Sequence, residues 1–163
     1  MSSGATDAQQ RRRSISLADV EIDAFLAHAS VARVATISSD GRPHVTPLWF
    51  LWRDGAVWLY SLVRSRRWTD LVERPDAAVV VDDGDDFGTL RGVEIRGCVT
   101  TVGEQPRVGT ADPLLAPVEQ GYLDKYGGDP QSMYDGRHAW VRIAGDEIRS
   151  WDHHKIPGTG AQR

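Results

Sequence analysis

Short runs of apolar residues, separated by turns rich in Gly, Asp and Pro, make up most of the chain. Residues 93–103 alternate between two kinds of side chain, which is typical of a strand with two unlike faces. The whole pattern predicts strands at residues 31–38, 44–52, 56–61, 77–83 and 93–103, and a final hairpin-like pair at 137–151. Tight turns at Asp40-Gly41 and Asp54-Gly55 join the first three strands, so the sheet begins as an antiparallel meander.

Apolar residues at helical spacing predict helical segments at residues 17–30, 65–73 and 113–127. The second segment must stop at Pro75, because proline cannot continue a helix. The third is either one helix or two short ones, since Pro117 and Gly121 interrupt it. Several short strands with few helices favour a small barrel with helices over its openings.

The composition fits a single globular domain. A length of 163 residues suits one domain with a sizeable core. The formal net charge of −4 argues against a nucleic-acid partner, which usually needs a basic domain. No apolar run approaches the ~18–20 residues that span a bilayer, so we expect no membrane partner. Cys98 is the only cysteine, which favours a reducing, cytoplasmic location.

Both ends of the chain are polar. We expect residues 1–15 to form a disordered arm, residues 16–155 to form the domain, and residues 156–163 to form a flexible tail. The arm has no apolar stretch behind its arginines, so no secretory signal is expected. Its cluster Arg11-Arg12-Arg13 fits a solvated tail, which we favour, or contact with an anionic partner.

The segment from Ser61 to Arg67 joins a predicted strand to a predicted helix and concentrates positive charge. Arg64, Arg66 and Arg67 lie within four residues, although the chain as a whole is acidic. A phosphate bound there would meet the hydroxyls of Ser61 and Ser65, the N–H groups of a helix N-terminus, and guanidinium forks that pair bidentately. The segment is therefore a candidate phosphate site.

An internal anion is the alternative explanation for the arginines. The acidic stretch at residues 82–86, DDGDD, offers four carboxylates that could neutralise a solvated arginine cluster. Chemistry alone leaves both interpretations open. The chain lacks the GxxxxGK[ST] loop, so a nucleoside triphosphatase is not expected.

Several motifs in order resemble the pyridoxamine 5′-phosphate oxidase-like superfamily. They are RPHVTPLWF, WLYS, SRR, a helix and AVVVDD, and the resemblance covers about residues 20–155. The family pattern has an aromatic–Thr/Ser pair, three residues, and then Ser-Arg-Lys. This chain has Tyr60-Ser61 and then Ser65-Arg66-Arg67, with arginine in place of the lysine. Residues 80–97 and 148–155 are similar to an actinobacterial branch in which many members use the deazaflavin coenzyme F-420 in place of FMN.

The resemblance implies a fold and a homodimer. Members of the superfamily are split-β-barrel flavoproteins that are typically dimeric. The implied fold class is mainly β (α+β): an antiparallel, six-stranded, Greek-key-like split barrel with flanking helices.

The resemblance also implies a cofactor site. The phosphate would lie at the Ser61–Arg67 turn, the ring would lie along the strand from His44 to Trp49, and Arg64 would reach an anionic tail. Trp151 would form a pocket wall near the cofactor of the partner subunit. The residues expected to bind the cofactor are His44, Val45, Thr46, Pro47, Leu48, Trp49, Tyr60, Ser61, Arg64, Ser65, Arg66, Arg67 and Trp151.

Three of these residues have an alternative role. Arg64 either reaches the anionic tail of the cofactor or is a solvent-facing loop residue, and both interpretations are open. Trp49 either offers a flat surface to the ring or packs in the core, and we favour core packing because six tryptophans cannot all contact a ligand. His44 either bonds to the cofactor or substrate or has a structural role, which we favour.

The function implied is that of an oxidoreductase that binds F-420 and transfers hydride to a small, conjugated organic acceptor. No catalytic side chain is assigned, because flavin-type cofactors carry the hydride chemistry themselves. One alternative is an FMN-binding oxidase or reductase of the pyridoxamine phosphate oxidase type. Another is a non-catalytic module that binds flavin or haem. Oxidation of the vitamin is not expected, since the chain lacks the family's Arg-rich C-terminal segment.

Other reactive residues carry less weight. His153 and His154 are adjacent and have no third ligand at useful spacing, so no metal is expected. The acidic loop lacks the spacing of an EF-hand. Cys98 is expected to be a small buried residue without a redox role.

Overall fold

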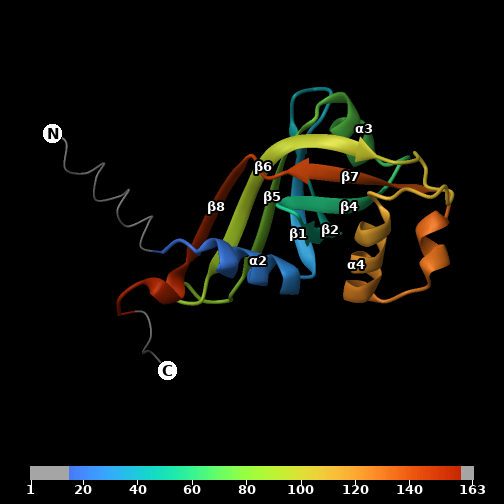
Figure 1. The fold of residues 1–163 in the computed structure, drawn as a ribbon. Coiled ribbons are helices and arrows are strands. Elements are labelled where there is room, and N and C mark those ends of the chain that lie inside the picture. The colour runs from blue at the N-terminus through green and yellow to red at the C-terminus, as the bar shows by residue number, and fades with distance from the viewer. Residues whose placement is uncertain (1–14, 159–163) are drawn as a thin grey trace.

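The computed structural model describes residues 15–158 as an antiparallel sheet with helices packed around it (Figure 1). The strands are β1 (Val31–Ile37), β2 (Pro43–Trp49), β3 (Leu51–Arg53), β4 (Ala56–Leu62), β5 (Asp76–Asp83), β6 (Arg91–Val102), β7 (His138–Ala144) and β8 (Glu147–Asp152). The helices are α2 (Asp19–His28), α3 (Arg66–Glu73) and α4 (Ala116–Tyr126), with 3-10 turns η1 (Pro130–Tyr134) and η2 (His153–Lys155). Residues 1–14 of the expected arm and 159–163 of the expected tail lie outside the described residues.

The strands follow the order β2-β1-β5-β6-β7-β4-β3, and β8 is an additional partner of β6. Each of these pairings is antiparallel. This topology confirms the predicted mainly β, split-barrel class with flanking helices, although the sheet is not closed. The sheet has eight strands where six were expected, because residues 44–52 form two strands and β8 extends the sheet beside β6.

The predicted single strand at 44–52 is wrong at Phe50, where the chain leaves one half of the sheet for the other. β2 pairs with β1, whereas β3 pairs with β4. The Phe50 N–H donates to the Tyr126 hydroxyl (3.0 Å), and the Phe50 carbonyl accepts from Tyr126 (2.8 Å) and from Lys125 Nζ (3.1 Å). Because α4 satisfies this peptide, the strand can break there without leaving buried polar groups unpaired.

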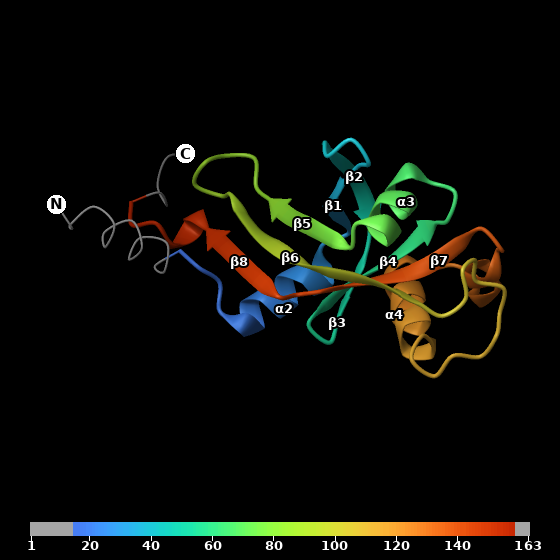
Figure 2. The same ribbon diagram turned by 90° about the horizontal axis from the view of Figure 1, so that it is seen from above.

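The predicted hairpin at 137–151 is also wrong, because β7 and β8 both pair with β6 and not with each other. β8 lies along Arg91–Arg96 of β6, and β7 lies along Val99–Val102. Figure 2 shows the result: β5, β6 and β8 form an arm that extends away from β4 and β7. Gly97 sits between the two pairings, and a side chain there would collide with the Ala144 carbonyl oxygen.

Two hydrophobic clusters lie on opposite faces of β4 and β7. The first fills the space among β1, β4, β5, β6, β7, α2 and α3, and includes Phe25, Leu26, Phe50, Leu59, Trp68, Leu71, Ile95 and Val141. The second lies under α4 and η1, and includes Leu51, Trp58, Leu115, Val118, Tyr122, Met133 and Trp140. β4 and β7 are therefore buried on both faces, which explains why AVWLYS is almost continuously apolar.

A buried ion pair fixes α4 to the loop that follows β6. Arg107, which is 2% exposed, donates from Nε to Glu119 Oε1 over 2.7 Å and from a terminal nitrogen to Oε2 over 3.3 Å. Trp140 Nε1 also donates to Glu119 (3.2 Å), as does the Tyr134 hydroxyl (3.2 Å). These bonds satisfy both charges inside the second cluster and hold α4 against β7.

Candidate functional site

The turn between β4 and α3 is built by one serine at each end. Ser61, which is fully buried, closes β4. Ser65 is the N-cap of α3: its hydroxyl accepts from the Trp68 N–H (3.1 Å) and donates to the Leu62 carbonyl (2.8 Å). Trp68 and Leu71 are buried in the core and fix the helix in place. The sequence thus presents the N-terminus of α3 beside the end of β4, as predicted.

Arg67 joins this turn to β2. Its guanidinium donates to the Ser61 hydroxyl over 3.1 Å and lies 3.4 Å from the Thr46 hydroxyl. Burial lowers the pKa of Arg67, although a guanidinium stays charged in proteins. Its Nε is buried and has no hydrogen-bond partner among residues 15–158. A buried N–H donor almost always has an acceptor, so this atom fits an oxygen supplied by a ligand or by water.

The acidic stretch does not neutralise the arginines of the turn. Asp82 pairs with Arg33, and Asp83 pairs with Arg91 over 2.9 Å. Within the described part of the chain, the three arginines of the turn have no carboxylate at ion-pair distance. The internal-anion alternative is therefore wrong, and the charge of the turn remains available to an external anion.

β2 presents two different faces to the site. His44, Thr46 and Leu48 are half-buried, whereas Val45 and Pro47 are exposed on the other face. Successive side chains of a strand point to opposite faces of the sheet. Only alternate side chains of residues 44–49, the strand expected to line the cofactor ring, can therefore face the turn. Thr46, from the half-buried face, is the residue that reaches Arg67.

Trp49 is not a core residue, so the core-packing interpretation is wrong. It is 55% exposed at the end of β2. One face of its indole stacks on the Tyr126 ring, with centroids 4.6 Å apart and planes 4° apart. The stack holds a flat aromatic surface in a fixed orientation beside β2.

A second polar group lies next to Thr46. His44 Nδ1 lies 3.8 Å from Asp70 Oδ2, and Thr36 donates to the same oxygen over 3.2 Å. Asp70 is 3% exposed and lies one helical turn after Arg67 on α3. Neither Asp70 nor Thr36 was predicted as a site residue. The only sequence signal was the three-residue spacing of Arg67 and Asp70, which places both on one face of a helix.

Tyr60 and Arg64 lie apart from the Arg67 contacts. Tyr60 belongs to the face of β4 under α4, where its hydroxyl donates to the Met133 carbonyl over 2.7 Å. Burial raises the pKa of this phenol. Arg64 and Arg66 are exposed on the turn itself. Arg137, which the sequence did not single out, lies beside them, because its carbonyl accepts from the Val63 N–H (3.0 Å).

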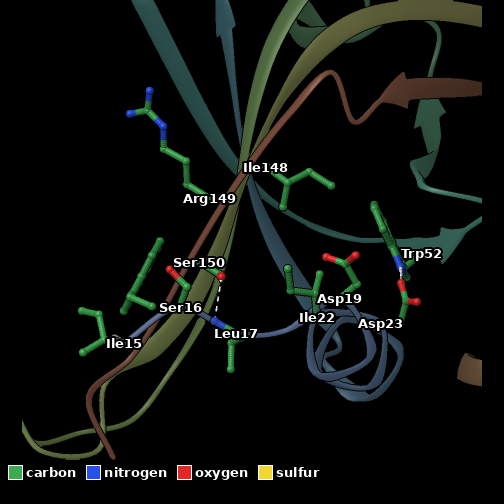
Figure 3. A pocket seen from close by; sticks show the side chains of 11 residues that line it. Ile15, Ser16, Leu17, Asp19, Ile22, Asp23, Trp52, Ile148, Arg149 and Ser150 are labelled. Carbon is green, nitrogen blue, oxygen red and sulfur yellow. Dashed lines mark hydrogen bonds between the residues drawn. The ribbon is translucent and has the colours of Figure 1, made fainter. Parts of the chain in front are cut away.

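Trp151 lies on β8, in the extended part of the sheet formed by β5, β6 and β8, away from the β4–α3 turn. It is one of the residues that line a cleft of about 900 Å³ between α2, β3 and β8. Figure 3 labels Trp52 and Ile148 in the same cleft. In this cleft, Trp52 Nε1 donates to Asp23 over 2.7 Å. The cleft contains no residue of the β4–α3 turn, so Trp151 and Arg67 do not meet in this cleft.

The other reactive residues have local partners. His154 Nδ1 lies 2.8 Å from Asp152, and His153 Nδ1 lies 2.6 Å from the Phe87 carbonyl. Among residues 15–158, no three His, Cys, Asp or Glu side chains are grouped to hold a metal ion. Cys98 is exposed, so its predicted burial is wrong; it lies on the outer face of β6. None of the helices described has the length and apolar character that crossing a bilayer requires.

Comparison with known proteins identifies what the chain resembles. The family model described as pyridoxamine 5′-phosphate oxidase matches residues 18–152. A search of curated proteins returns no significant match. The conserved hypothetical protein Rv2991 from Mycobacterium tuberculosis is 29% identical, with a TM-score of 0.78 and 93% of each chain covered.

Two more distant structures share the fold. The haem storage protein HutZ from Vibrio cholerae is 13% identical, with a TM-score of 0.67, and the match covers 80% of this chain and 92% of that one. An F-420 reductase is 20% identical, with a TM-score of 0.58, and the match covers 77% of this chain and 94% of that one. At these identities the likeness concerns the fold.

Proposed function

Since the chain belongs to the pyridoxamine 5′-phosphate oxidase family, we propose that it is an oxidoreductase that binds the deazaflavin coenzyme F-420 at the β4–α3 turn. The proposed reaction is hydride transfer to a small, conjugated organic acceptor. The observation that carries the proposal is the Arg67 Nε, a buried cationic donor at the N-terminus of a helix that has no acceptor among residues 15–158. Such a position favours a phosphate oxygen.

Different residues of the chain would bind the phosphate and the ring of the cofactor. Arg67 and Arg66 would pair with the phosphate, and Ser61 would share its hydroxyl between Arg67 and the phosphate. Ser65 would hold the N-terminus of α3 in place by capping the Trp68 N–H. The backbone of β2, from Val45 to Trp49, would set the plane of the ring. The bound cofactor supplies the hydride, and the protein supplies position and electrostatics.

The exposed arginines favour F-420 over FMN. Arg64 and Arg137 lie beside the turn, and within residues 15–158 neither has a carboxylate at ion-pair distance. FMN ends at its phosphate and would leave both side chains without a partner. F-420 continues into an anionic tail, whose carboxylates would pair with them.

The outer face of the sheet supports a homodimer. Val31, Ile37, Val45 and Trp49 are 41%, 42%, 57% and 55% exposed on neighbouring positions of β1 and β2. Exposed apolar residues gathered on one face of a sheet mark an interaction surface, and Arg33, which lies among them, has its charge paired with Asp82. The strand registers put Trp151 on the same face of the sheet, at its other edge. A second copy on this face would bring its own Trp151 towards β2, which fits Trp151 as a wall of the partner's site.

The cytoplasm remains the proposed location. Cys98, the only cysteine of the chain, is exposed and unpaired with another thiol. A free, exposed thiol is compatible with a reducing compartment.

Titration of the full-length protein with F-420 and with FMN, followed by cofactor fluorescence, tests the proposal. Saturable binding of F-420, tighter than that of FMN, is the expected result. Tighter binding of FMN would favour the FMN-dependent alternative. Binding of neither cofactor would contradict both the F-420-dependent and the FMN-dependent function. The haem-binding module would then be the remaining alternative, and a titration with haem would test it.

A further inference from the structure

Asp70 is a buried carboxylate in an unusual place. It lies in the middle of α3, is 3% exposed, and faces β1 and β2 instead of solvent. Its Oδ2 accepts from the Thr36 hydroxyl over 3.2 Å and lies 3.8 Å from His44 Nδ1. Burying a carboxylate is costly unless donors surround it. An apolar side chain at this position of α3 would pack without that cost. The buried carboxylate therefore calls for a functional explanation.

The neighbouring side chain of His44 is incompletely hydrogen-bonded among the described residues. Its Nδ1 is buried and has no hydrogen-bond partner among the described residues. One third of the side chain is exposed, so the exposed edge of the imidazole is the edge away from Nδ1. A gap of 3.8 Å exceeds a hydrogen bond, but a small rotation of the ring would close it. Hydrogen bonds between catalytic groups are often long without ligand and shorten when it binds.

Asp70 and His44 belong to one row of polar side chains between β2 and α3. His44 and Thr46 are alternate residues on the same face of β2, and Arg67 and Asp70 are one turn apart on α3. His44 faces Asp70 at one end of the row, and Thr46 contacts Arg67 at the other. The imidazole therefore lies one same-face position along β2 from the contact between Thr46 and Arg67.

We propose that Asp70 is a positioning residue for His44, and that His44 delivers the proton that the acceptor takes up when it is reduced. This inference rests on the proposed oxidoreductase function. Asp70 accepts a hydrogen bond from Nδ1–H and thereby aims Nε2 at the ligand side of β2. A carboxylate that orients an imidazole through Nδ1 fixes both its tautomer and its direction.

The proton balance explains why such a group is needed. Reduction of a conjugated acceptor by a reduced deazaflavin or flavin adds one hydride and one proton. The reduced cofactor would release the hydride as its own bond to that hydrogen breaks, and would be left oxidised. The hydride would form a C–H bond at one end of the conjugated system, and the displaced π-electron pair would move to the other end. The Nε2–H bond of the His44 imidazolium breaks there, and the proton forms the second new bond. His44 is left neutral, keeps Nδ1–H towards Asp70, and takes a proton from water through its exposed edge.

A purely structural role for Asp70 makes a different prediction. In that case the contact with Thr36 would matter, because it pins α3 to β1, and His44 would be incidental. Thr36→Val removes the hydroxyl but keeps the carboxylate, whereas Asp70→Asn keeps a similar shape and removes the charge. Asp76→Asn, at an exposed position on β5, is the matched control for the loss of one acid.

The first test needs no cofactor. Nitrogen-15 NMR of the full-length protein reports which nitrogen of the neutral His44 carries the proton. We expect the proton on Nδ1 in the wild type, in Thr36→Val and in Asp76→Asn, and a shift towards Nε2 in Asp70→Asn. A wild-type His44 protonated mainly on Nε2 would overturn the positioning role, and so would an unchanged tautomer in a folded Asp70→Asn protein.

The second test uses the rate of acceptor reduction. Loss of a general acid typically costs about 10²–10⁴-fold, so we expect His44→Gln to lower the rate at least about 10²-fold and Asp70→Asn to lower it about tenfold. The affinity for the cofactor should change less than about twofold in both variants. A rate within threefold of wild type in His44→Gln would overturn proton delivery. If neither cofactor binds, the proposed function and proton delivery both fail, and the tautomer still decides the positioning role.

Discussion

The guanidinium of Arg67 donates to the Ser61 hydroxyl over 3.1 Å, and this bond ties the first turn of α3 to the end of β4. Ser61 is fully buried, so its hydroxyl has few other partners. The bond fixes the guanidinium between β2 and α3, while its Nε has no acceptor in the part of the chain that the structure describes. A site that is rigid and incomplete in this way is prepared for an anion, because little ordering remains to be done on binding.

The distal arginines should distinguish the two cofactors. The double variant Arg64→Ala/Arg137→Ala removes two exposed cations, each expected to contribute about 0.2–1 kcal/mol through an ion pair. Affinity for F-420 should therefore fall roughly 2- to 30-fold, whereas affinity for FMN should stay unchanged. Fluorescence titration measures both. Arg53→Ala, an exposed arginine beside Asp54, is the control, and equal losses for the two cofactors would contradict the role of Arg64 and Arg137.

The apolar face of β1 and β2 should hold the dimer together. Val45 is 57% exposed at its centre, opposite Ala35. Val45→Glu would bury an unpaired carboxylate in the interface, so we expect sedimentation velocity to show a dimer for the wild type and a monomer for the variant. Val20→Glu, at a residue that is 74% exposed on α2, should leave the dimer intact. A wild-type protein that is monomeric at micromolar concentration would contradict the proposed interface.

The buried pair of Arg107 and Glu119 should dominate the stability of the α4 side of the fold. Arg107→Met leaves the Glu119 charge buried with only Trp140 and Tyr134 as donors, and removing one partner of a buried pair costs about 3–5 kcal/mol. We expect this loss in the free energy of unfolding measured with urea. The double variant Arg107→Met/Glu119→Leu should recover part of it, because no unpaired charge remains. A loss below about 1 kcal/mol would be incompatible with a desolvated pair.

Lys125 should make stability depend on pH above neutrality. Burial lowers the pKa of its ammonium from 10.5 to about 8, while Nζ lies 3.1 Å from the Phe50 carbonyl. Between pH 8 and 10.5 the unfolded chain binds a proton that the folded chain has released, so the free energy of unfolding rises with pH in this window. Comparison of wild type with Lys125→Met between pH 7.5 and 9.5 isolates this effect below the titration of the tyrosines. A difference that is independent of pH would contradict the shift.

The parts of the fold that the sequence predicts are those that depend on near neighbours. Ser65 opens α3 because its own hydroxyl caps a residue three positions on. The turn at Asp54-Gly55 forms because both residues adopt positive φ, which few other residues do at low cost. Strand positions follow from alternation that any short window of sequence contains.

The parts that it does not predict depend on partners far away in the chain. Phe50 breaks the strand because Tyr126, 76 residues later, supplies its hydrogen bonds. β8 leaves β7 because β6 is long enough to pair with both. No local window contains these competing contacts, and a strand-like pattern is the same in either pairing.

The candidate site shows the same difference between features set by near neighbours in the sequence and features set by distant partners. Ser61, Ser65 and Arg67 could be predicted because the turn carries them within seven residues. Asp70 could not, because on an isolated helix it is an ordinary acidic residue. Its significance comes from Thr36 on β1 and His44 on β2, which the fold brings to it.

The central claim is that Arg67 holds the phosphate of a flavin-type cofactor, and the most direct measurement is the affinity of the wild type and of Arg67→Met for F-420. Hydrogen bonds to charged groups contribute about 1.5–3 kcal/mol, so the account predicts binding that is roughly 10- to 150-fold weaker in the variant. The melting temperature without cofactor serves as the check on folding. Equal affinity in a folded Arg67→Met protein would place the phosphate elsewhere and contradict the account.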